Sequence, residues 1–507
     1  MNKLTTVFAL LSLLIFSTCS KDFLEVEPLV GSTEVNYYQN GNDAEAAIIA
    51  CYNPLQQEVT NIQGSGQLAP HFRWYFGDVC SDDSEKGGSG DGDEPELFQF
   101  ENFNGTANSK IILAEWQVAY KAIAYCNIAL DKIPEIDMDE DDKNRFLAEA
   151  KFIRAYNYYT LVTMFGGVPL ITEALSPSEY QQPRASANEI WNLIQTDLIE
   201  ARNDLPRRSS ISVSQLGRAT WGAATSLLAK AYAYQNNWGL TYDMAGEVVL
   251  SNEYFLDPNF SNIFTLAGEN GSGSIFEIQY MNASGGNWGN QLEGTFTNIF
   301  QRARGNFNGF GFNIPKEGLV SEFENNDPRL SLSIFREGDV MGDRGVFTLE
   351  ATGFSYNYYN RKYFSNNADD ATFGDAAPNG PSNDRVIRLA DVMLLYAEAA
   401  WHTGDNLTVR NMVNLVRERA RGGNNSVLPD VNGQVMGDAL LDRVYHERRV
   451  ELAMEGHRFF DLVRQGRAGD ILRAQGANFV DGVHEIFPIP AAEITLSGGD
   501  VTQNPGY

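Results

Sequence analysis

The chain has 507 residues, and its 66 acidic side chains outnumber the 38 basic ones, which gives a formal charge of −28 at pH 7. Binding to a nucleic-acid backbone depends on Lys and Arg displacing counterions, so this charge excludes nucleic acid as a partner. Apart from one cysteine near the N-terminus, the chain contains Cys51, Cys80 and Cys126. An odd number without C-x-x-C spacing allows at most one disulfide and makes a zinc site unexpected.

The N-terminus has the layout of an export signal. Lys3 precedes an apolar run from Val7 to Phe16, which is shorter than the roughly 20 residues that a permanent membrane span needs. The run ends at Ser17, Thr18 and Cys19, an arrangement that resembles a bacterial lipoprotein signal, in which the cysteine is lipidated. We therefore predict a signal peptide over 1–18 and a lipidated tether over 19–40. An ordinary secretory signal with an incidental cysteine is the alternative.

Helical patterns then dominate the chain. The stretch "DAEAAIIACYNPLQQ" begins with Asp43 as a plausible cap, and apolar residues at steps of three and four predict a long helix that stops near Pro134. A further helix over 144–165 is expected to end at Gly166, where Gly-Gly and a following Pro are typical stop signals. The acids of "DMDEDDK" favour the start of that helix through its dipole.

Two stretches match a tetratricopeptide unit of roughly 34 residues. In 217–255, two helices flank a turn at Asn236-Asn237, and the same plan recurs in 388–421 with small residues such as Ala397 along one helix. Small residues let neighbouring helices approach closely, as a solenoid requires. We predict a mainly α protein with a tetratricopeptide-like helical repeat scaffold (an α-α superhelix) over about 41–251 and 385–420. Generic helical packing is the alternative.

Between about 252 and 384 apolar residues no longer recur at helical spacing, and Gly, Asn and aromatic residues are frequent. This part contains one strand-like run, Ile275 to Tyr280. We interpret this part as a loop-rich insertion. Long irregular insertions are usually functional or disordered, and the many aromatic residues argue against disorder.

Motifs for catalysis are missing from the sequence. It contains no H-E-x-x-H, G-x-S-x-G or Walker-type run, and its five histidines lack metal-ligand spacing. We therefore predict no catalytic residues, no metal and no cofactor, although a pair of hydrolytic carboxylates cannot be recognised from sequence. The acidic stretch 81–96 could wrap a cation with Asp82, Asp91 and Asp93, but we favour a solvated loop.

Aromatic residues beside polar ones point to sugar binding, because sugars present flat C–H faces edged by hydroxyls. Two stretches, "HFRWYFGD" and "YMNASGGNWGNQ", combine these residue types. The candidate ligand-binding residues are Arg73, Trp74, Tyr75, Asp78, Tyr280, Asn282, Trp288, Asn290 and Gln291. For Trp74 and Tyr75 a core strand is an equally good interpretation, whereas the glycines around Trp288 favour exposure.

The stretch from Leu441 to Ala468 carries charges at helical spacing and predicts a helix with ion pairs. Its run "ERRVELAMEGHRFFDLVR" resembles the signature of the SusD/RagB family of Bacteroidetes outer-membrane lipoproteins. The stretches "RLADVMLLYAEAA", "AKFIRAYNYYTLVTMFGGVPLI" and "FPIPAAEITLSGGDVTQNPGY" and the leader "CSKDFLEVEP" support the same resemblance, which covers the chain from Cys19 to Tyr507.

This resemblance implies a single domain over 41–507 whose C-terminal motif, 441–507, marks the fold. It also implies a lipid-anchored, surface-exposed outer-membrane protein without enzymatic activity. Such a protein captures oligosaccharides and caps a SusC-like TonB-dependent transporter. Some members of the family bind peptides instead. The alternatives from other classes are a carbohydrate-active hydrolase and a scaffold that uses its repeats only for protein contacts.

Overall fold

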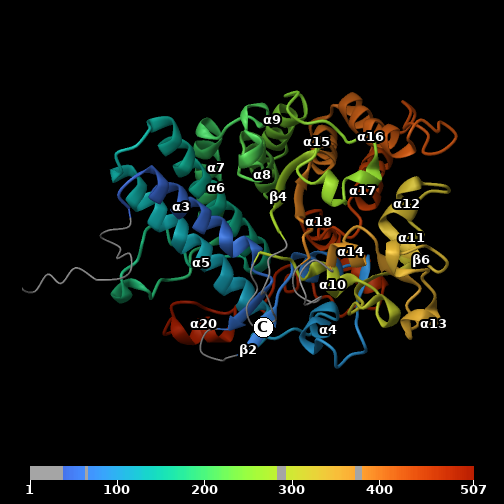
Figure 1. The fold of residues 1–507 in the computed structure, drawn as a ribbon, viewed down its shortest axis with the longest axis horizontal. Coiled ribbons are helices and arrows are strands. Elements are labelled where there is room, and N and C mark those ends of the chain that lie inside the picture. Colours follow the sequence, from blue (N-terminus) through green and yellow to red (C-terminus); the bar gives the residue numbers. More distant parts are fainter. Residues whose placement is uncertain (1–37, 63–66, 282–292, 371–379) are drawn as a thin grey trace, which may run out of the picture.

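A computed structural model describes residues 38–62, 67–281, 293–370 and 380–507. Helices dominate these residues (Figure 1). The longer helices are α3 (Gly41–Tyr52), α5 (Lys110–Lys132), α6 (Glu140–Phe165), α7 (Ala187–Asp204), α8 (Trp221–Tyr234), α9 (Trp238–Val249), α15 (Leu389–Thr403), α16 (Asn406–Arg421) and α17 (Asp438–Glu451). The shorter ones are α4 (Pro95–Glu101), α10 (Thr297–Gln301), α11 (Glu317–Val320), α12 (Pro328–Ser333), α13 (Leu349–Thr352), α14 (Asn367–Asp370), α18 (Arg458–Arg464), α19 (Ala468–Ala474) and α20 (Ala491–Leu496). The predicted mainly α class is confirmed.

Local signals explain where the helices begin and end. The cap of α3 is Asn40 rather than the predicted Asp43, whose side chain instead accepts from the backbone of Asn40 to complete a capping box. Helix α6 begins after the cap Asp139 with three acids in its first turn, as the dipole argument predicts. It ends at Gly166, whose φ of 72° suits glycine.

The long helices form one continuous array. Helix α3 packs on α5 and α6, and each of α5 to α8 packs against the next helix in the chain. The array then continues from α9 to α15, α16 and α17. Residues 250–388 therefore enter and leave between two neighbouring helices, as the predicted insertion requires. The helix-by-helix stacking fits a repeat scaffold, and the assignment to tetratricopeptide units stays a prediction.

The insertion contains more regular structure than expected. Its strands are β4 (Ser274–Ile278), β5 (Phe312–Pro315), β6 (Ile334–Arg336), β7 (Tyr358–Asn360) and β8 (Asp384–Arg388). Strand β4, which was predicted, pairs antiparallel with β8 and closes the base of the insertion beside α15. Strand β5 pairs with β3 (Ser84–Gly87), and β6 pairs with β7. A separate hairpin, β1 (Val59–Ile62) and β2 (Gln67–Pro70), follows α3.

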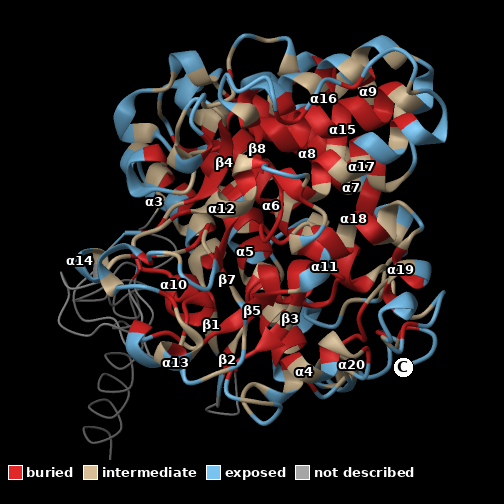
Figure 2. Cartoon of the chain, turned by 90° about the vertical axis from the view of Figure 1, so that its right-hand side faces the viewer, coloured by how far each residue is buried: buried red, intermediate tan, exposed pale blue. Residues whose placement is uncertain are grey.

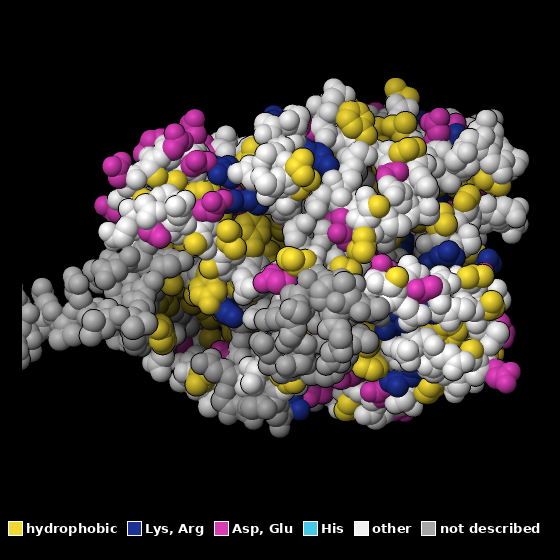
Figure 3. All heavy atoms as spheres, in the orientation of Figure 1, with side chains coloured by type: hydrophobic (Ala, Val, Ile, Leu, Met, Phe, Trp, Pro, Cys, Tyr) yellow, Lys and Arg dark blue, Asp and Glu magenta, His cyan; other side chains and the backbone are white. Residues whose placement is uncertain are grey.

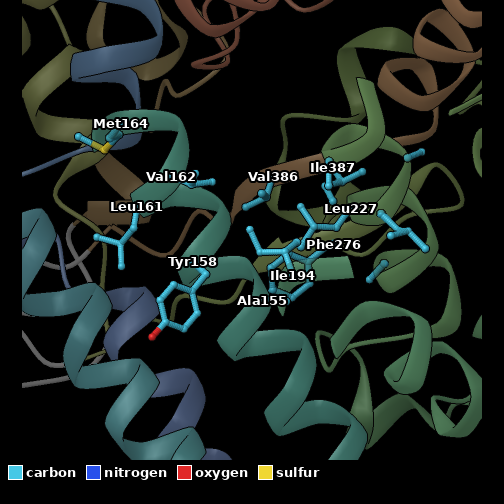
Figure 4. Packing of buried hydrophobic residues seen from close by; sticks show 14 of the residues in the cluster. Ala155, Tyr158, Leu161, Val162, Met164, Ile194, Leu227, Phe276, Val386 and Ile387 are labelled. Atoms are coloured by element: carbon cyan, nitrogen blue, oxygen red, sulfur yellow. The ribbon is translucent and has the colours of Figure 1, made fainter. Parts of the chain in front are cut away.

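One hydrophobic core joins the helical array to the base of the insertion. Buried residues run through the centre of the molecule, and exposed ones lie on the outer turns (Figure 2). Leu227 of α8 and Ala155 of α6 lie close to Phe276 of β4 and Ile387 of β8 in this core (Figure 4). The three body cysteines, Cys51, Cys80 and Cys126, are buried free thiols.

Two expectations about charged stretches are wrong. The predicted helix over 441–468 is divided into α17 and α18 by a turn at Gly456, and its charges make buried long-range ion pairs. The stretch after Ser81 is not simply a solvated loop, because Asp82 is buried against Arg458 and Arg449. Further along it, the ammonium of Lys86 donates to two backbone carbonyls of the Gly-rich turn.

Candidate functional site

A cavity of about 180 Å³ lies where the helical array meets the insertion. Side chains of α5, α6, α8 and α18 form its helical side. Residues 54–58, 71–76 and the strands β4 and β8 close the other side. Hydrophobic side chains also gather in a hollow on the left of the face in Figure 3. The cavity is therefore assembled from segments that lie hundreds of residues apart.

Aromatic rings and aliphatic side chains make up most of the described cavity wall. The aromatic wall residues are Phe72, Trp74, Phe76, Tyr156, Tyr159, Tyr234, Tyr280, Tyr363 and Phe460. Trp74 stacks on Phe72 at 5.1 Å between ring centroids and meets Tyr75 edge-on at 4.4 Å, so its ring is held rigidly. The indole Nε1 of Trp74 has no hydrogen-bond partner among the described residues. A buried donor without a partner is costly, and an oxygen of a bound molecule would satisfy it.

Arg73 supplies the fixed polar part of this wall. Its guanidinium binds the Asp384 carboxylate through two hydrogen bonds, of 3.0 Å from Nε and 2.8 Å from Nη2. It also donates from Nη1 to the backbone carbonyl of Glu455 at 2.7 Å. Burial would raise the pKa of Asp384, but the Arg73 charge outweighs burial and holds that pKa below its ordinary value. The bidentate pair fixes the position of Arg73 and neutralises it.

Glu58 anchors the insertion to the hairpin beside the cavity. Its carboxylate accepts hydrogen bonds from Thr295 Oγ1 at 2.7 Å, from the backbone N–H of Phe296 at 2.5 Å and from Thr297 Oγ1 at 2.9 Å. Burial raises the pKa of Glu58 to about 7 in spite of these donors. Glu58 therefore holds residues 295–297 against the cavity wall.

The predicted aromatic loop is attached at this cavity through its flanking residues. The backbone of Met281 donates to the carbonyl of Glu293 at 2.8 Å, which brings the two ends of the segment 282–292 together. Next to Met281, Tyr280 lies on the cavity wall. Thr295 forms a β-bridge with Gly380, so Gly380, which follows the segment 371–379, also lies close to residues 295–297.

The structure brings together three of the predicted ligand residues, since Arg73, Trp74 and Tyr280 all line the cavity. Tyr75 and Asp78 lie behind the wall and are buried. Asp78 accepts from the Gly456 backbone at 2.8 Å and from Asn313, and burial raises its pKa to about 7.

Trp74 and Tyr75 are buried, as the core interpretation expected, but in a helical turn rather than a strand. Four further candidates, Asn282, Trp288, Asn290 and Gln291, lie outside the described residues, as does Cys19.

Sequence reasoning missed several residues of the wall. Glu58, His71, Tyr156, Tyr363, Asp384 and His457 line the cavity without belonging to any recognisable motif. They come from six separate segments, so only the tertiary structure reveals that they are neighbours. One weak signal was available in the aromatic spacing Tyr156, Tyr159 of α6, which places two rings on one helix face.

Two other features, a metal centre and a membrane-spanning helix, are not found in the described ranges. Within them, no group of three or more His, Cys, Asp or Glu side chains is arranged to hold a metal ion. No described helix combines the length and the apolar character needed to span a bilayer. Phe300 and Phe307 are buried core residues.

The fold and the cavity define a class of helical binding proteins, and comparisons with known proteins identify the family. The model of the SusD family matches residues 272–507, and a model described as "Starch-binding associating with outer membrane" matches residues 91–233.

Solved structures and other known proteins of the same family are also similar to this chain. A laminarin-binding SusD-like protein shares 32% sequence identity, with a TM-score of 0.79 over 93% of this chain and all of that one. Surface glycan-binding protein A from Bacteroides fluxus shares 25%, with a TM-score of 0.78 over 92% of this chain and all of that one. SusD-like protein P38 of Formosa agariphila is 26% identical over 92% of both chains.

The chain belongs to the SusD family. The resemblance found in the C-terminal signature is thereby confirmed. Where the matched descriptions name an activity, they name binding, and one family model names an association with the outer membrane. This agrees with the predicted lack of enzymatic activity.

Proposed function

We propose that this protein is a cell-surface lipoprotein that captures oligosaccharides and delivers them to a SusC-like TonB-dependent transporter in the outer membrane. The observation that carries the proposal is the aromatic cavity at the junction of the array and the insertion, in a chain of the SusD family. The laminarin-binding relative supports a glycan as the ligand.

The wall offers both kinds of contact that a sugar needs. Rings such as Trp74 and Tyr280 can lie against the apolar C–H face of a pyranose, and the unpartnered indole N–H can donate to a hydroxyl. A rigid, preformed wall of this kind loses little conformational entropy when a ligand binds. Trp288, Asn282 and Asn290 would extend the contact from the segment attached beside Tyr280.

Lipidation of Cys19 would tether the body to the outer membrane. Anchoring through two or more acyl chains is firm, so the body would stay beside the transporter while its position varies. Metabolic labelling with a radioactive fatty acid tests this step. Label in the protein, lost on Cys19→Ser, supports the anchor, and label that persists in the variant contradicts it.

Calorimetric titration of the purified protein against plant, algal and host oligosaccharides tests the capture step. We expect saturable binding to one class of glycan, weakened by Trp74→Phe, which keeps a ring in the core and removes the N–H donor. Unchanged affinity in this variant would contradict a role for the cavity. Pull-down of the lipidated protein from membranes tests delivery, which requires a co-purifying TonB-dependent transporter.

Two alternatives give different results in the same assays. A peptide-binding member of the family would show no binding to any glycan of the panel and saturable binding to peptides. A hydrolase would release new reducing ends from a polysaccharide, which the proposed function does not allow.

A further inference from the structure

The cavity wall carries four cationic side chains, and each of them is already neutralised by the protein. Arg73 is paired with Asp384 at 2.8 Å, and Lys230 with Asp391 at 2.7 Å. Arg448 lies 2.7 Å from both Asp391 and Asp461, and Arg464 lies 2.8 Å from Glu398 and 2.9 Å from Asp461. All of these carboxylates are buried or mostly buried, so water does not screen the pairs as it does at a surface.

The histidines on the wall add no spare charge. His71 lies 3.5 Å from the carboxylate of Glu115, and its other ring nitrogen faces Thr60 Oγ1 at 3.0 Å. His457 is partly buried, and desolvation together with neighbouring cations lowers its pKa to about 3, so it is neutral at physiological pH.

Acidic side chains outnumber lysines and arginines on the wall. Against the four cations stand five acids that line the cavity, Glu58, Glu115, Asp384, Glu455 and Asp461. Residues 63–66, 282–292 and 371–379 contain no Lys, Arg or His, and only one charged residue, Asp375. Among the described wall residues, an anion entering this space would meet no unpaired cation and several acids.

We propose that this site takes neutral oligosaccharides and rejects those that carry carboxylate or sulfate groups. The inference rests on the proposed glycan-binding function and specifies the class of glycan. A buried charge without a partner is strongly unfavourable, and placing like charges together costs several kcal/mol in an interface. Hydroxyl groups, by contrast, need only hydrogen-bond donors and acceptors, which the wall supplies through its tyrosines, its amides and the Trp74 indole.

One cation next to the cavity lining, Lys121, can be used to test this proposal. Lys121 of α5 donates to Gln57, a wall residue, at 3.3 Å, and its ammonium lies 6.0 Å from the centre of the Tyr125 ring. No carboxylate partner of Lys121 lies within ion-pair distance among the described residues. If anionic glycans bind here, Lys121 is the group that would attract them.

The experiment uses the purified full-length protein in detergent and three length-matched probes. These are a linear β-1,3-linked glucohexaose, a hexagalacturonate and a sulfated κ-carrageenan hexaose, each titrated by calorimetry at low and high salt. Where the glucohexaose does not bind, neutral hexaoses of other linkages replace it. The variant Lys121→Gln and the matched control Lys143→Gln on α6 are titrated in the same way.

We expect a neutral hexaose to bind with an affinity that salt and Lys121→Gln leave unchanged, and both anionic hexamers to bind at least about a hundredfold more weakly. Anionic binding that is tighter than neutral binding, falls with salt and is lost in Lys121→Gln would overturn the inference while leaving glycan capture intact. If no neutral or anionic hexamer binds, both the proposed function and this inference are wrong.

Discussion

Two regions of the molecule bury many charged groups, but they use them differently. The first is a buried cluster around Glu451 of α17, formed with Arg329, Arg388, Arg419 and Lys362. The second is the cavity wall, where charges are paired behind a surface of aromatic rings. Glu455 belongs to both, since it pairs with Arg388 and lines the cavity.

The difference between the two regions is the space that they enclose. Around Glu451 the carboxylate oxygens lie 2.5 Å from Arg419 and 3.2 Å from Arg329 and Arg388, and the groups are almost fully buried. Burial would raise the pKa of Glu451, but the three arginines lower it to about 2. This cluster joins α17 to α15, α16 and the insertion, and none of its five groups lines the aromatic cavity. Buried charge in this protein therefore marks the framework, and the aromatic cavity marks the site.

Breaking the Glu451 cluster should have the largest effect. Glu451→Gln removes one negative charge from among three arginines, and we expect it to lower the free energy of unfolding by about 3 to 5 kcal/mol, the usual cost of leaving buried charge uncompensated. Chemical denaturation followed by circular dichroism measures this. The control Glu418→Gln, at an exposed position of α16, should change stability by less than about 0.5 kcal/mol. Equal stability of the two variants would refute a framework role for the cluster.

Glu58 should give the next largest effect, and it depends on pH. The unfolded chain releases this proton near pH 4.5, but the folded protein retains it up to about pH 7 because burial disfavours the charged form. Its stabilising contribution is therefore complete below pH 4.5 and is lost as pH rises towards 7. The difference between the two pKa values corresponds to about 3 kcal/mol.

The comparison of wild type with Glu58→Gln isolates this contribution, because Asp78 and other groups titrate in both proteins. We expect wild type to lose about 3 kcal/mol relative to the variant between pH 5 and pH 8, measured by denaturation at each pH. Glu135→Gln, on an exposed turn, should follow wild type at every pH. If the difference in free energy of unfolding between wild type and Glu58→Gln stays constant with pH, folding does not shift the pKa of Glu58, and the prediction is wrong.

The framework was more predictable than the site. Helix starts and stops are local, so the acids before α6 and the glycine after it were enough to place that helix. The signature in α17 and α18 identified the family, but its charges were interpreted as ion pairs along one helix, because sequence spacing records only neighbours on the same helix. Their actual partners, such as Arg329 and Arg388, are long-range.

The site was only half predictable for a related reason. Arg73, Trp74 and Tyr280 were found because aromatic and polar residues adjoin in sequence, whereas Glu58, Tyr156 and Asp384 become neighbours only through the packing of α6, β1 and β8. The same adjacency rule also selected Tyr75 and Asp78, which point to the core side of the same turn. Composition can indicate a sugar platform, but it cannot tell which side of a helical turn faces the cavity.

Trp288 gives the smallest effect and the most specific one, because it should alter binding without altering the framework. If its ring stacks on the glycan, Trp288→Ala should weaken affinity by about 2 kcal/mol, or about thirtyfold, as expected for an aromatic anchor in a binding site. The free energy of unfolding should stay within about 0.5 kcal/mol of wild type, since a residue that contacts mainly ligand contributes little to the core.

The matched control is Trp238→Ala. Trp238 stacks on His402 at 3.9 Å at the outer end of α9 and is not part of the cavity wall. Its loss should leave affinity unchanged and lower stability modestly. If the two variants instead weaken binding equally, the aromatic segment beside Tyr280 is not the contact. If Trp288→Ala lowers stability like a core substitution, Trp288 belongs to the framework, and the division between framework and site would have to be redrawn around it.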